Sequence, residues 1–309
     1  MADLKPCAEP PPQANATPWA GLAASQHYPA GALYVVATPI GNRADITLRA
    51  LHVLAQADAV ACEDTRHTAQ LLAGYGLRRP LLALHEHNEA NAARDVVERL
   101  RAGQRVAYVS DAGTPGVSDP GARLCAAVRA AGLRCVPVPG ASSVTALLSV
   151  AGLAEGAVTL VGFLPAKGRA RAEAWQRWMA LPTGLVLLEA PHRIERLAGE
   201  LAALGQRPVT VGRELTKRFE EIVTLPCADL AAWLAADSQR QRGEFTLLIH
   251  PPDTSARHDD VGLTPQARRV LALLLQELPP ARAARLAAAI TGAPRDALYA
   301  AAAAEPSTP

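Results

Sequence analysis

The sequence predicts an α/β protein built on a mainly parallel β-sheet with helices covering both faces. A strand–loop–helix pattern recurs five times between residue 33 and about residue 150. Half of the 309 residues are hydrophobic but only 4% are aromatic, and alanine and leucine dominate, which suits helices packed on a sheet. Polar clusters directly follow the apolar runs. Since parallel strands have their carboxyl ends at one edge of the sheet, a ligand site is expected there.

Each expected strand of the first half is a short apolar run that ends in a polar or Gly/Pro-rich loop. These runs are Leu33 to Ala37, Ala57 to Cys62, Pro80 to Leu84, Val106 to Val109 and Arg134 to Val138. Asp45 is expected to cap the helix after the first strand, and Asp119 with Pro120 to open the helix after the fourth. The loop from Val109 to Gly121, VSDAGTPGVSDPG, is the first candidate for a ligand floor, because glycine lets the backbone come close to a ligand.

The length allows two domains and a sizeable core. Residues 1–31 form a Pro- and Ala-rich leader without periodicity, expected to be disordered, and residues 32–153 form the N-terminal α/β domain. Residues 154–252 are expected to form a mixed-sheet α/β domain, because only some of its strands have helices between them. Its strands are Val158 to Phe163, Gly184 to Glu189, Val209 to Glu214, Glu220 to Leu225 and Phe245 to His250.

Residues 262–305 are expected to form a small helical module of three helices, broken at Pro279-Pro280 and at Thr291 to Pro294. The Gly-containing turn gives helix-turn-helix spacing, which is typical of nucleic-acid contact but also of a helical hairpin that packs on the body.

Composition excludes several classes of protein. The net charge of +2 does not indicate a nucleic-acid binder, so a basic surface would have to be local. The five cysteines are scattered without a CxxC pair, which disfavours a zinc ribbon and suits a reducing cytoplasm. No signal peptide and no apolar run of about 18 residues is found, so no membrane partner is expected.

The familiar catalytic templates are missing: there is no P-loop, no GxGxxG after the first strand and no GxSxG elbow. His85 and His87 lack a third ligand at suitable spacing, so no metal site is expected. The EDTRH cluster at residues 63–67 has two interpretations. Asp64 or Thr65 caps a helix, or Asp64 or His67 takes a proton while Arg66 holds a phosphate.

Charged clusters also end strands of the second half, at residues 189–193 and 213–218, and a basic loop lies at residues 167–171. Their cations either face an anionic substrate or form ion pairs and solvated surface.

Taken together, the loops resemble those of the tetrapyrrole-methylase superfamily, and within it the ribosomal small-subunit RNA methyltransferase I family. The shared motifs are TPIGN, EDTRHT, SDAGTPGVSDPG, PGASS, GFLPxKG, EAPHR, GRELTK and a late GEF. The resemblance runs from about Leu33 to His250 and extends to the helical tail, while the leader lies outside it. The PGASSV and EAPHR segments depart modestly from relatives.

The resemblance implies two α/β domains with S-adenosylmethionine in a cleft between them, a C-terminal helical module and a homodimer. It implies 2′-O-methylation of a cytidine ribose in the decoding region of 16S rRNA of the small ribosomal subunit, in the cytoplasm. By the same analogy, these residues would contact the cofactor: Pro39, Asp111, Gly113, Thr114, Ser142, Ser143, Glu189 and Arg213.

A sulfonium methyl is already activated, so the enzyme must align the reacting atoms and remove the hydroxyl proton. Asp64 is the favoured base, with Glu189 and Lys217 as rivals. Cations that could hold RNA phosphates are Arg66, Arg193, Arg213 and Lys217.

Two other functions remain open. One is methylation of a corrin or porphyrin precursor, which the same fold performs, although the tail and EDTRHT favour RNA. The other is a ligand-sensing DNA-binding regulator that uses residues 281–303, where cations are few.

Overall fold

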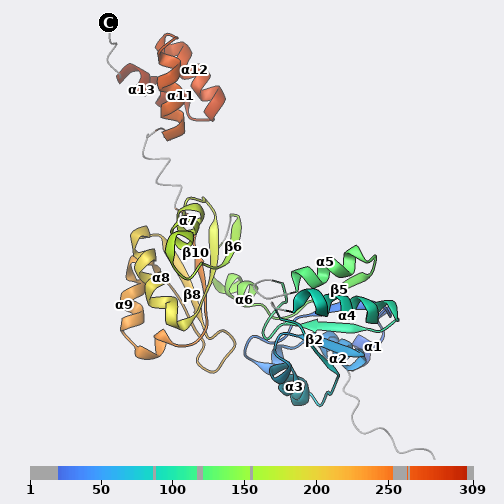
Figure 1. Cartoon of the computed structure of the whole chain (residues 1–309). Helices are drawn as coiled ribbons and strands as arrows, with labels where there is room; N and C mark the ends of the chain where they lie inside the picture. The colour runs from blue at the N-terminus through green and yellow to red at the C-terminus, as the bar shows by residue number, and fades with distance from the viewer. Residues whose placement is uncertain are drawn as a thin grey trace, which may run out of the picture. The chain divides into compact units, whose positions relative to one another are not determined.

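The computed structural model of the chain describes residues 20–85, 88–116, 121–153, 156–252, 263 and 265–304 (Figure 1). The chain divides into two compact units, residues 1–251 and residues 252–309. The first unit holds both β-sheets, and the second holds the C-terminal helices.

The first sheet has five strands, all parallel as the strand–loop–helix pattern predicts, and their order is β3-β2-β4-β1-β5. The strands are β1 (Ala32–Val36), β2 (Ala59–Cys62), β3 (Leu81–Ala83), β4 (Val106–Val109) and β5 (Arg134–Val138). The bounds of β4 and β5 are the predicted ones, and the ends of the other strands differ by one or two residues. The sheet is therefore a parallel α/β sheet with its loops at one edge.

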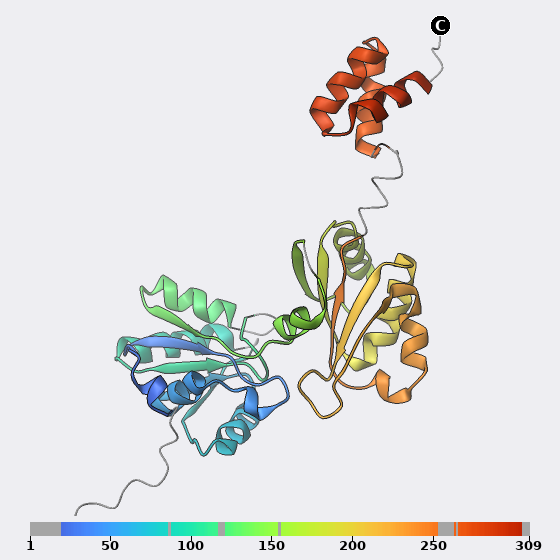
Figure 2. The same cartoon turned by 180° about the vertical axis from the view of Figure 1, so that it is seen from behind.

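Helices cover both faces of this sheet (Figures 1 and 2). They are α1 (Ala20–Ala24), α2 (Leu48–Gln56), α3 (Thr65–Gly74), α4 (Glu89–Arg101) and α5 (Ala122–Ala130). The next helix, α6 (Ser143–Val150), follows β5 and packs on the other sheet of this unit. Residues of α2 and α3, such as Leu54 and Leu72, pack into the core of one face. Residues of α4 and α5, such as Val96 and Leu124, pack into the core of the other.

The expected cap at Asp45 is wrong. Thr47 is the N-cap of α2, and its Oγ1 accepts a hydrogen bond from the Ala50 N–H at 3.1 Å. Asp45 instead ends a short 3₁₀ helix (Arg43–Asp45) that Asn42 caps. Three residues capable of capping lie within this short stretch, and the backbone path selects two of them. The predicted helix start at Asp119 and Pro120 lies outside the described residues, and α5 begins at Ala122.

The second sheet is mixed, in the order β6-β7-β10-β8-β9. Only β6 and β7 are parallel, and the remaining pairs are antiparallel. The strands are β6 (Val158–Phe163), β7 (Gly184–Glu189), β8 (Pro208–Arg213), β9 (Glu221–Pro226) and β10 (Phe245–Ile249). The mixed α/β sheet expected from the sequence is confirmed.

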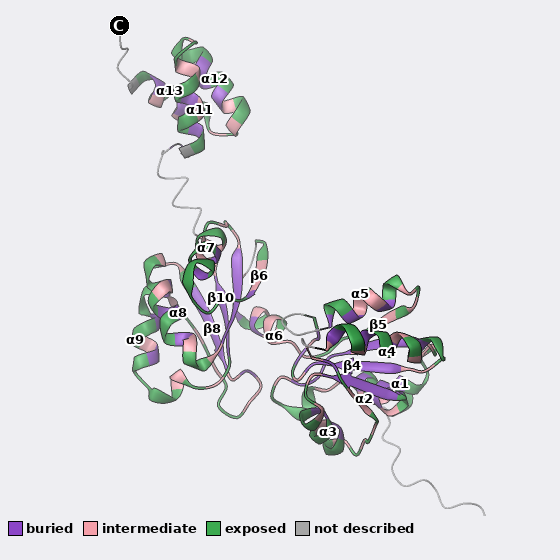
Figure 3. Ribbon diagram, in the orientation of Figure 1, coloured by how far each residue is buried: buried purple, intermediate pink, exposed green. Residues whose placement is uncertain are grey.

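The two faces of the second sheet differ in what covers them. On one face, α7 (Gly168–Met179), α8 (Ile194–Leu201) and α9 (Leu230–Ala235) close the largest hydrophobic core. The other face receives α6, whose Leu147 packs with Val186 and Leu248. Figure 3 shows the buried central strands of this sheet and the more exposed β6 at its edge.

The second unit consists of α11 (Pro265–Leu275), α12 (Pro280–Thr291) and α13 (Arg295–Ala304). Small side chains let the helices approach closely, and the core includes Ala283, Ala284, Ala287 and Leu298. The helices are separated where the sequence predicts, at Pro279 and at residues 292–294. Across the described residues of the chain, no helix combines the length and hydropathy needed to cross a membrane.

Candidate active site

Two neighbouring cavities lie in the first unit and share Ile40, Ala112 and Glu244 in their linings. The larger has a volume of about 430 Å³ and the smaller about 240 Å³. Both are lined by loops that follow strands of the first sheet and by residues of the second half. The volume of the larger cavity is in the range of small-molecule and cofactor sites.

Backbone hydrogen bonds join the loops after β1 and β4. The Thr38 N–H donates to the Gly113 carbonyl at 2.9 Å, and the Gly113 N–H donates to the Thr38 carbonyl at 3.1 Å. The Thr114 hydroxyl donates to the Ala141 carbonyl at 3.0 Å, which ties the loop after β5 to the same assembly. Gly113 and Thr114, two of the expected cofactor contacts, consequently form part of the wall of the larger cavity.

The two serines of the PGASS loop also line the larger cavity. Ser142 is the N-cap of α6, but its side chain makes no cap hydrogen bond. Its hydroxyl is therefore not committed to the helix end and can bond a ligand. Ser143 is the first residue of α6.

Pro39 and Asp111 line the smaller cavity. The Asp111 Oδ1 accepts a hydrogen bond from the Asp64 N–H at 3.3 Å, which connects the loop after β4 to the start of α3. These two expected cofactor contacts therefore line a different cavity from Gly113 and Ser142. The two cavities adjoin, because they share lining residues.

Asp64 caps α3, in agreement with one of the two interpretations of the EDTRH cluster. Its Oδ1 accepts from the Arg66 N–H at 2.8 Å and the His67 N–H at 3.2 Å. The pKa of Asp64 is lowered, because the backbone hydrogen bonds from His67 and Arg66 stabilise the carboxylate. Of this cluster, His67 lines the smaller cavity, while Asp64 and Arg66 line neither cavity.

The loop between β8 and β9 reaches the loop after β1. The Thr216 Oγ1 accepts a hydrogen bond from the Asn42 N–H at 3.1 Å. A Cβ at Gly41 would lie 2.4 Å from the Lys217 Cγ, so only glycine permits this close approach. Glu214 and Thr216 have φ values of 51° and 64°, a left-handed conformation that costs energy in a non-glycine residue and is typical of functional loops.

Lys217 is held as a cation at the edge of the smaller cavity. Its Nζ lies 2.9 Å from the Glu214 Oε1 and 3.1 Å from the Glu244 Oε2. Burial acts to lower the pKa of Lys217, but the hydrogen bonds to the two carboxylates outweigh it and raise the pKa overall. The pKa of Glu214 is lowered, because hydrogen bonds from the Glu244 N–H and Lys217 outweigh the effect of burial.

Glu189 lines the larger cavity and is 2% exposed. Its Oε1 lies 3.0 Å from the Arg193 Nε and accepts from the Ala190 N–H at 3.0 Å. The Arg193 guanidinium also donates to the Leu164 carbonyl. Glu189 and Arg193 are therefore already paired with each other.

Arg213 lines neither cavity. Its guanidinium donates to three backbone carbonyls, those of Arg242 at 2.8 Å, Gln239 at 2.6 Å and Phe219 at 3.2 Å. The structure thus uses Arg213 to join loops of the second half and does not bring it to the other predicted cofactor contacts.

Several lining residues were not predicted, although motifs contain them. Phe163 is the phenylalanine of GFLPxKG, Leu215 lies in GRELTK and Glu244 in GEF. Ile40 of TPIGN lines both cavities. Apolar motif residues attract less attention than charged ones in a sequence, yet a cofactor cavity is lined mainly by apolar groups. Among the described residues, no group of three or more His, Cys, Asp or Glu could hold a metal ion.

A family model described as Tetrapyrrole (Corrin/Porphyrin) Methylases matches residues 32–231, and one described as RsmI C-terminal HTH domain matches residues 261–305. The chain is 47% identical over 271 residues to the Ribosomal RNA small subunit methyltransferase I of Xylella fastidiosa strain Temecula1, covering 87% of this chain and 98% of the relative. It is 46% identical over 277 residues to the protein of the same name from Neisseria meningitidis strain Z2491, covering 89% and 94%.

Two solved structures show the same fold at low identity. A diphthine synthase matches with a TM-score of 0.56 and 17% identity over 71% of this chain and 90% of that chain. A uroporphyrin-III C-methyltransferase from Thermus thermophilus, complexed with S-adenosylhomocysteine, matches with a TM-score of 0.50 and 21% identity over 70% and 96%.

Proposed function

Because this chain belongs to the ribosomal RNA small subunit methyltransferase I family, we propose that it uses S-adenosylmethionine to methylate the 2′-hydroxyl of a cytidine ribose in 16S rRNA. The observation that carries the proposal is the larger cavity. Its lining combines residues of TPIGN, SDAGTPG and PGASS, which follow strands of the first sheet, with Glu189 at the end of β7.

The residues of the larger cavity fit the cofactor. Gly113 brings backbone to the wall, and a Cβ there would lie 3.2 Å from the Ile40 Cγ2. Hydroxyls of Ser142 and Ser143 and the backbone around Gly113 and Thr114 would hold its polar groups, with Pro39 and Asp111 contributing from the smaller cavity. The cofactor supplies an activated methyl group on a sulfonium. The residues of the protein must orient that methyl group, exclude water and accept the hydroxyl proton.

Three carboxylate or amine groups are proposals for the base, and their surroundings differ. Asp64, favoured from the sequence, caps α3 outside both linings. Lys217 has a raised pKa and is a cation at neutral pH, which suits phosphate binding better than proton removal. Glu189 lines the larger cavity, where its Oε1 lies 3.0 Å from the Arg193 Nε. We therefore propose Glu189 ahead of Asp64 as the base.

Cations around the cavities are proposed to hold RNA phosphates. Arg66 is exposed at the start of α3, and Lys217 lies at the smaller cavity. The guanidinium of Arg213 donates its hydrogen bonds to backbone carbonyls. We therefore propose that Arg213 affects RNA or cofactor binding indirectly, by holding the loops that it joins.

We also propose that the protein acts on ribosomes in the cytoplasm and that it is a homodimer. Val150, Val158 and Leu160 are between 37% and 56% exposed beside the face of the second sheet that α6 covers incompletely. Such exposed apolar side chains are typical of an interface.

The experiment that tests the function offers tritiated S-adenosylmethionine with three acceptors: free 16S rRNA, small subunits that lack the modification, and uroporphyrinogen. Label in RNA that maps to a cytidine ribose supports the proposal. Label confined to uroporphyrinogen would support the tetrapyrrole alternative, and tight duplex DNA binding without label would support a regulator. Glu189→Gln and Asp64→Asn then distinguish the bases, because loss of the base lowers kcat while cofactor binding is retained.

A further inference from the structure

Phenylalanine is rare in this chain, and its positions are informative. The three phenylalanines, Phe163, Phe219 and Phe245, all lie in the second half. Phe163 and Phe245 line the larger cavity, but only Phe163 is open to solvent, with 52% exposure against 2% for Phe245. An aromatic ring that lines a cavity and remains half exposed is available to a ligand at the mouth of that cavity.

A β-bulge in β6 decides where Phe163 lies. Leu160 pairs with Val186 of β7, whereas Gly162 pairs with Leu187 and Phe163 with Leu188, so Val161 is the extra residue. Without the bulge, Phe163 would pair with Glu189 and point to the face that α7, α8 and α9 cover. With it, Phe163 shares the face of Leu160 and Leu188, and Leu188 also lines the larger cavity.

Gly162 makes the bulge possible, since its φ of 72° is unfavourable for any residue with a side chain. Bulges next to active sites commonly redirect one side chain, and here the redirected side chain is the exposed ring. The position of Phe163 at the cavity is thus specified by the backbone.

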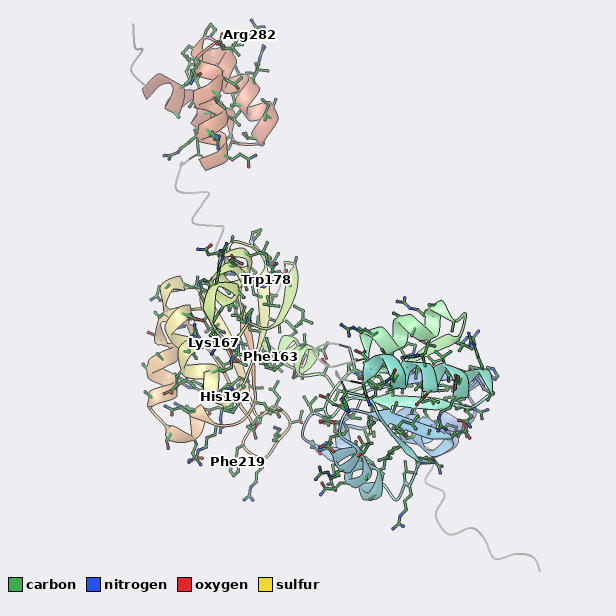
Figure 4. All side chains as sticks on the ribbon, in the orientation of Figure 1. Phe163, Lys167, Trp178, His192, Phe219 and Arg282 are labelled. Carbon is green, nitrogen blue, oxygen red and sulfur yellow. The ribbon has the colours of Figure 1, made fainter. Side chains whose placement is uncertain are left out.

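Two polar side chains follow this ring and the cavity lining closely in the sequence. Lys167 precedes α7 four residues after Phe163, and His192 follows the cavity-lining Pro191. Both are exposed, and Figure 4 shows them with Phe163 on the second α/β half. An exposed ring with the Lys167 ammonium and the His192 imidazole on the same half suits a nucleic-acid strand, whose bases stack on aromatic faces and whose phosphates bind such polar groups.

On the premise of the proposed RNA substrate, we infer that Phe163 is the stacking platform for the base of the target nucleotide. A 2′-hydroxyl inside a folded RNA reaches a cavity only when its nucleotide is unstacked, and the unstacked base then needs a flat partner. Phe163 provides that partner at the mouth of the larger cavity, while the polar lining at Thr114, Ser142 and Ser143 lies on the first half.

The test compares Phe163→Ala and Phe163→Tyr with Ile222→Ala. Ile222 is a matched control because it lies on β9, the other edge strand of the same sheet, and on the same face with 40% exposure, but lines neither cavity. Steady-state methylation of small subunits that lack the modification is measured together with the dissociation constant for S-adenosylmethionine and the oligomeric state. Loss of stacking on one base predicts a fall in kcat/KM for the subunit of about 5- to 150-fold in F163A.

We expect F163Y to restore most of this activity, I222A to remain within about twofold of the wild type, and cofactor affinity to be unchanged in all three. Wild-type activity on RNA with an unaffected F163A would overturn the inference and leave the proposed function intact. An F163A whose loss of activity follows a change in oligomeric state, and which Tyr does not restore, would also overturn it and assign the ring to a second copy of the chain. Absence of RNA methylation by the wild type would refute the proposed function itself.

Discussion

The two sheets of the first unit offer a ligand different chemistry at the ends of their strands. The first sheet contributes backbone groups and uncharged side chains, such as Gly113, Thr114 and Ser142. The second contributes the charged residues of the larger cavity, Glu189 and Glu244, which are already paired with Arg193 and Lys217 of the same half. A charged residue in a motif is therefore weak evidence for a ligand contact when its partners lie within the same fold.

The largest expected effect tests whether the charges of the second half are structural. Arg171 is 2% exposed, donates to the Glu200 carboxylate at 2.6–3.0 Å and to the Pro165 carbonyl at 2.9 Å, and lies 3.9 Å from the Glu189 Oε2. Arg171→Ala leaves the Glu200 and Glu189 carboxylates without this partner and should lower the free energy of unfolding by about 3–5 kcal/mol. Urea unfolding measures this difference.

Arg169→Ala is the matched control for that experiment. The Arg169 side chain is 93% exposed and pairs with Glu173 on the same helix, so its removal should change stability by less than about 0.5 kcal/mol. Equal effects of the two substitutions would contradict the view that the buried cluster stabilises the second half.

The second prediction concerns Arg213, a cofactor contact by resemblance. Arg213→Ala leaves three carbonyls without their donor and should lower the free energy of unfolding by about 2–3 kcal/mol. The dissociation constant of the folded protein for S-adenosylmethionine should stay within about twofold, as expected for a group outside the lining. Isothermal titration calorimetry at a temperature where the variant is folded measures this dissociation constant. A tenfold weaker binding of the cofactor would indicate that Arg213 contacts it.

The contrast also shows what a sequence can predict. The strands of the first sheet were found because each is a short apolar run followed by a loop-forming cluster, which is local information. The partners of Arg213 lie 6, 26 and 29 residues away, so no local pattern distinguishes this arginine from a ligand contact. The bulge at Val161 and Gly162 is equally hidden, because VTLVGF reads as an ordinary strand.

Helix capping failed for a different reason. Asn42, Asp45 and Thr47 all have side chains that can accept from a helix N-terminus, and all precede the same apolar pattern. The choice depends on which of them has extended backbone at the helix start, and the structure gives that geometry to Asn42 and Thr47. Sequence therefore predicts that a cap exists more securely than which residue provides it.

A third, smaller effect uses pH to test the charged loop of the second half. Since the pKa of Glu214 is lower in the folded chain than the ordinary value of 4.5, ionised Glu214 stabilises the fold above that pH. This contribution is lost as the pH falls through the lowered pKa. Wild type should therefore exceed Glu214→Gln in unfolding free energy at pH 7, and the difference should shrink as the pH falls below 4.5 in urea unfolding. A difference that is independent of pH would contradict the ion pair with Lys217.

The fourth prediction addresses the first sheet, where binding rather than stability should respond. The Ser142 side chain makes no cap hydrogen bond, so Ser142→Ala should change the free energy of unfolding by less than about 0.5 kcal/mol. Loss of one hydrogen bond to the cofactor should weaken its binding by about fivefold. Parallel measurements by urea unfolding and calorimetric titration give both values, and a destabilised variant with unchanged affinity would place Ser142 with the structural residues.

The smallest effect separates the scaffold of the second half from its cavity face. Gly199 lies inside α8, and a Cβ added there meets no atom within 4 Å. Gly199→Ala should raise the free energy of unfolding by about 0.5–1 kcal/mol, because alanine loses less backbone entropy in a helix. Gly21→Ala is its counterpart in α1, and that helix has only five residues, so its gain should be smaller. Because α8 covers the face of the second sheet opposite α6, cofactor affinity should not change in Gly199→Ala. A change in affinity would mean that the helix-covered face and the cavity are coupled, and that the division between structural charges and binding groups does not hold.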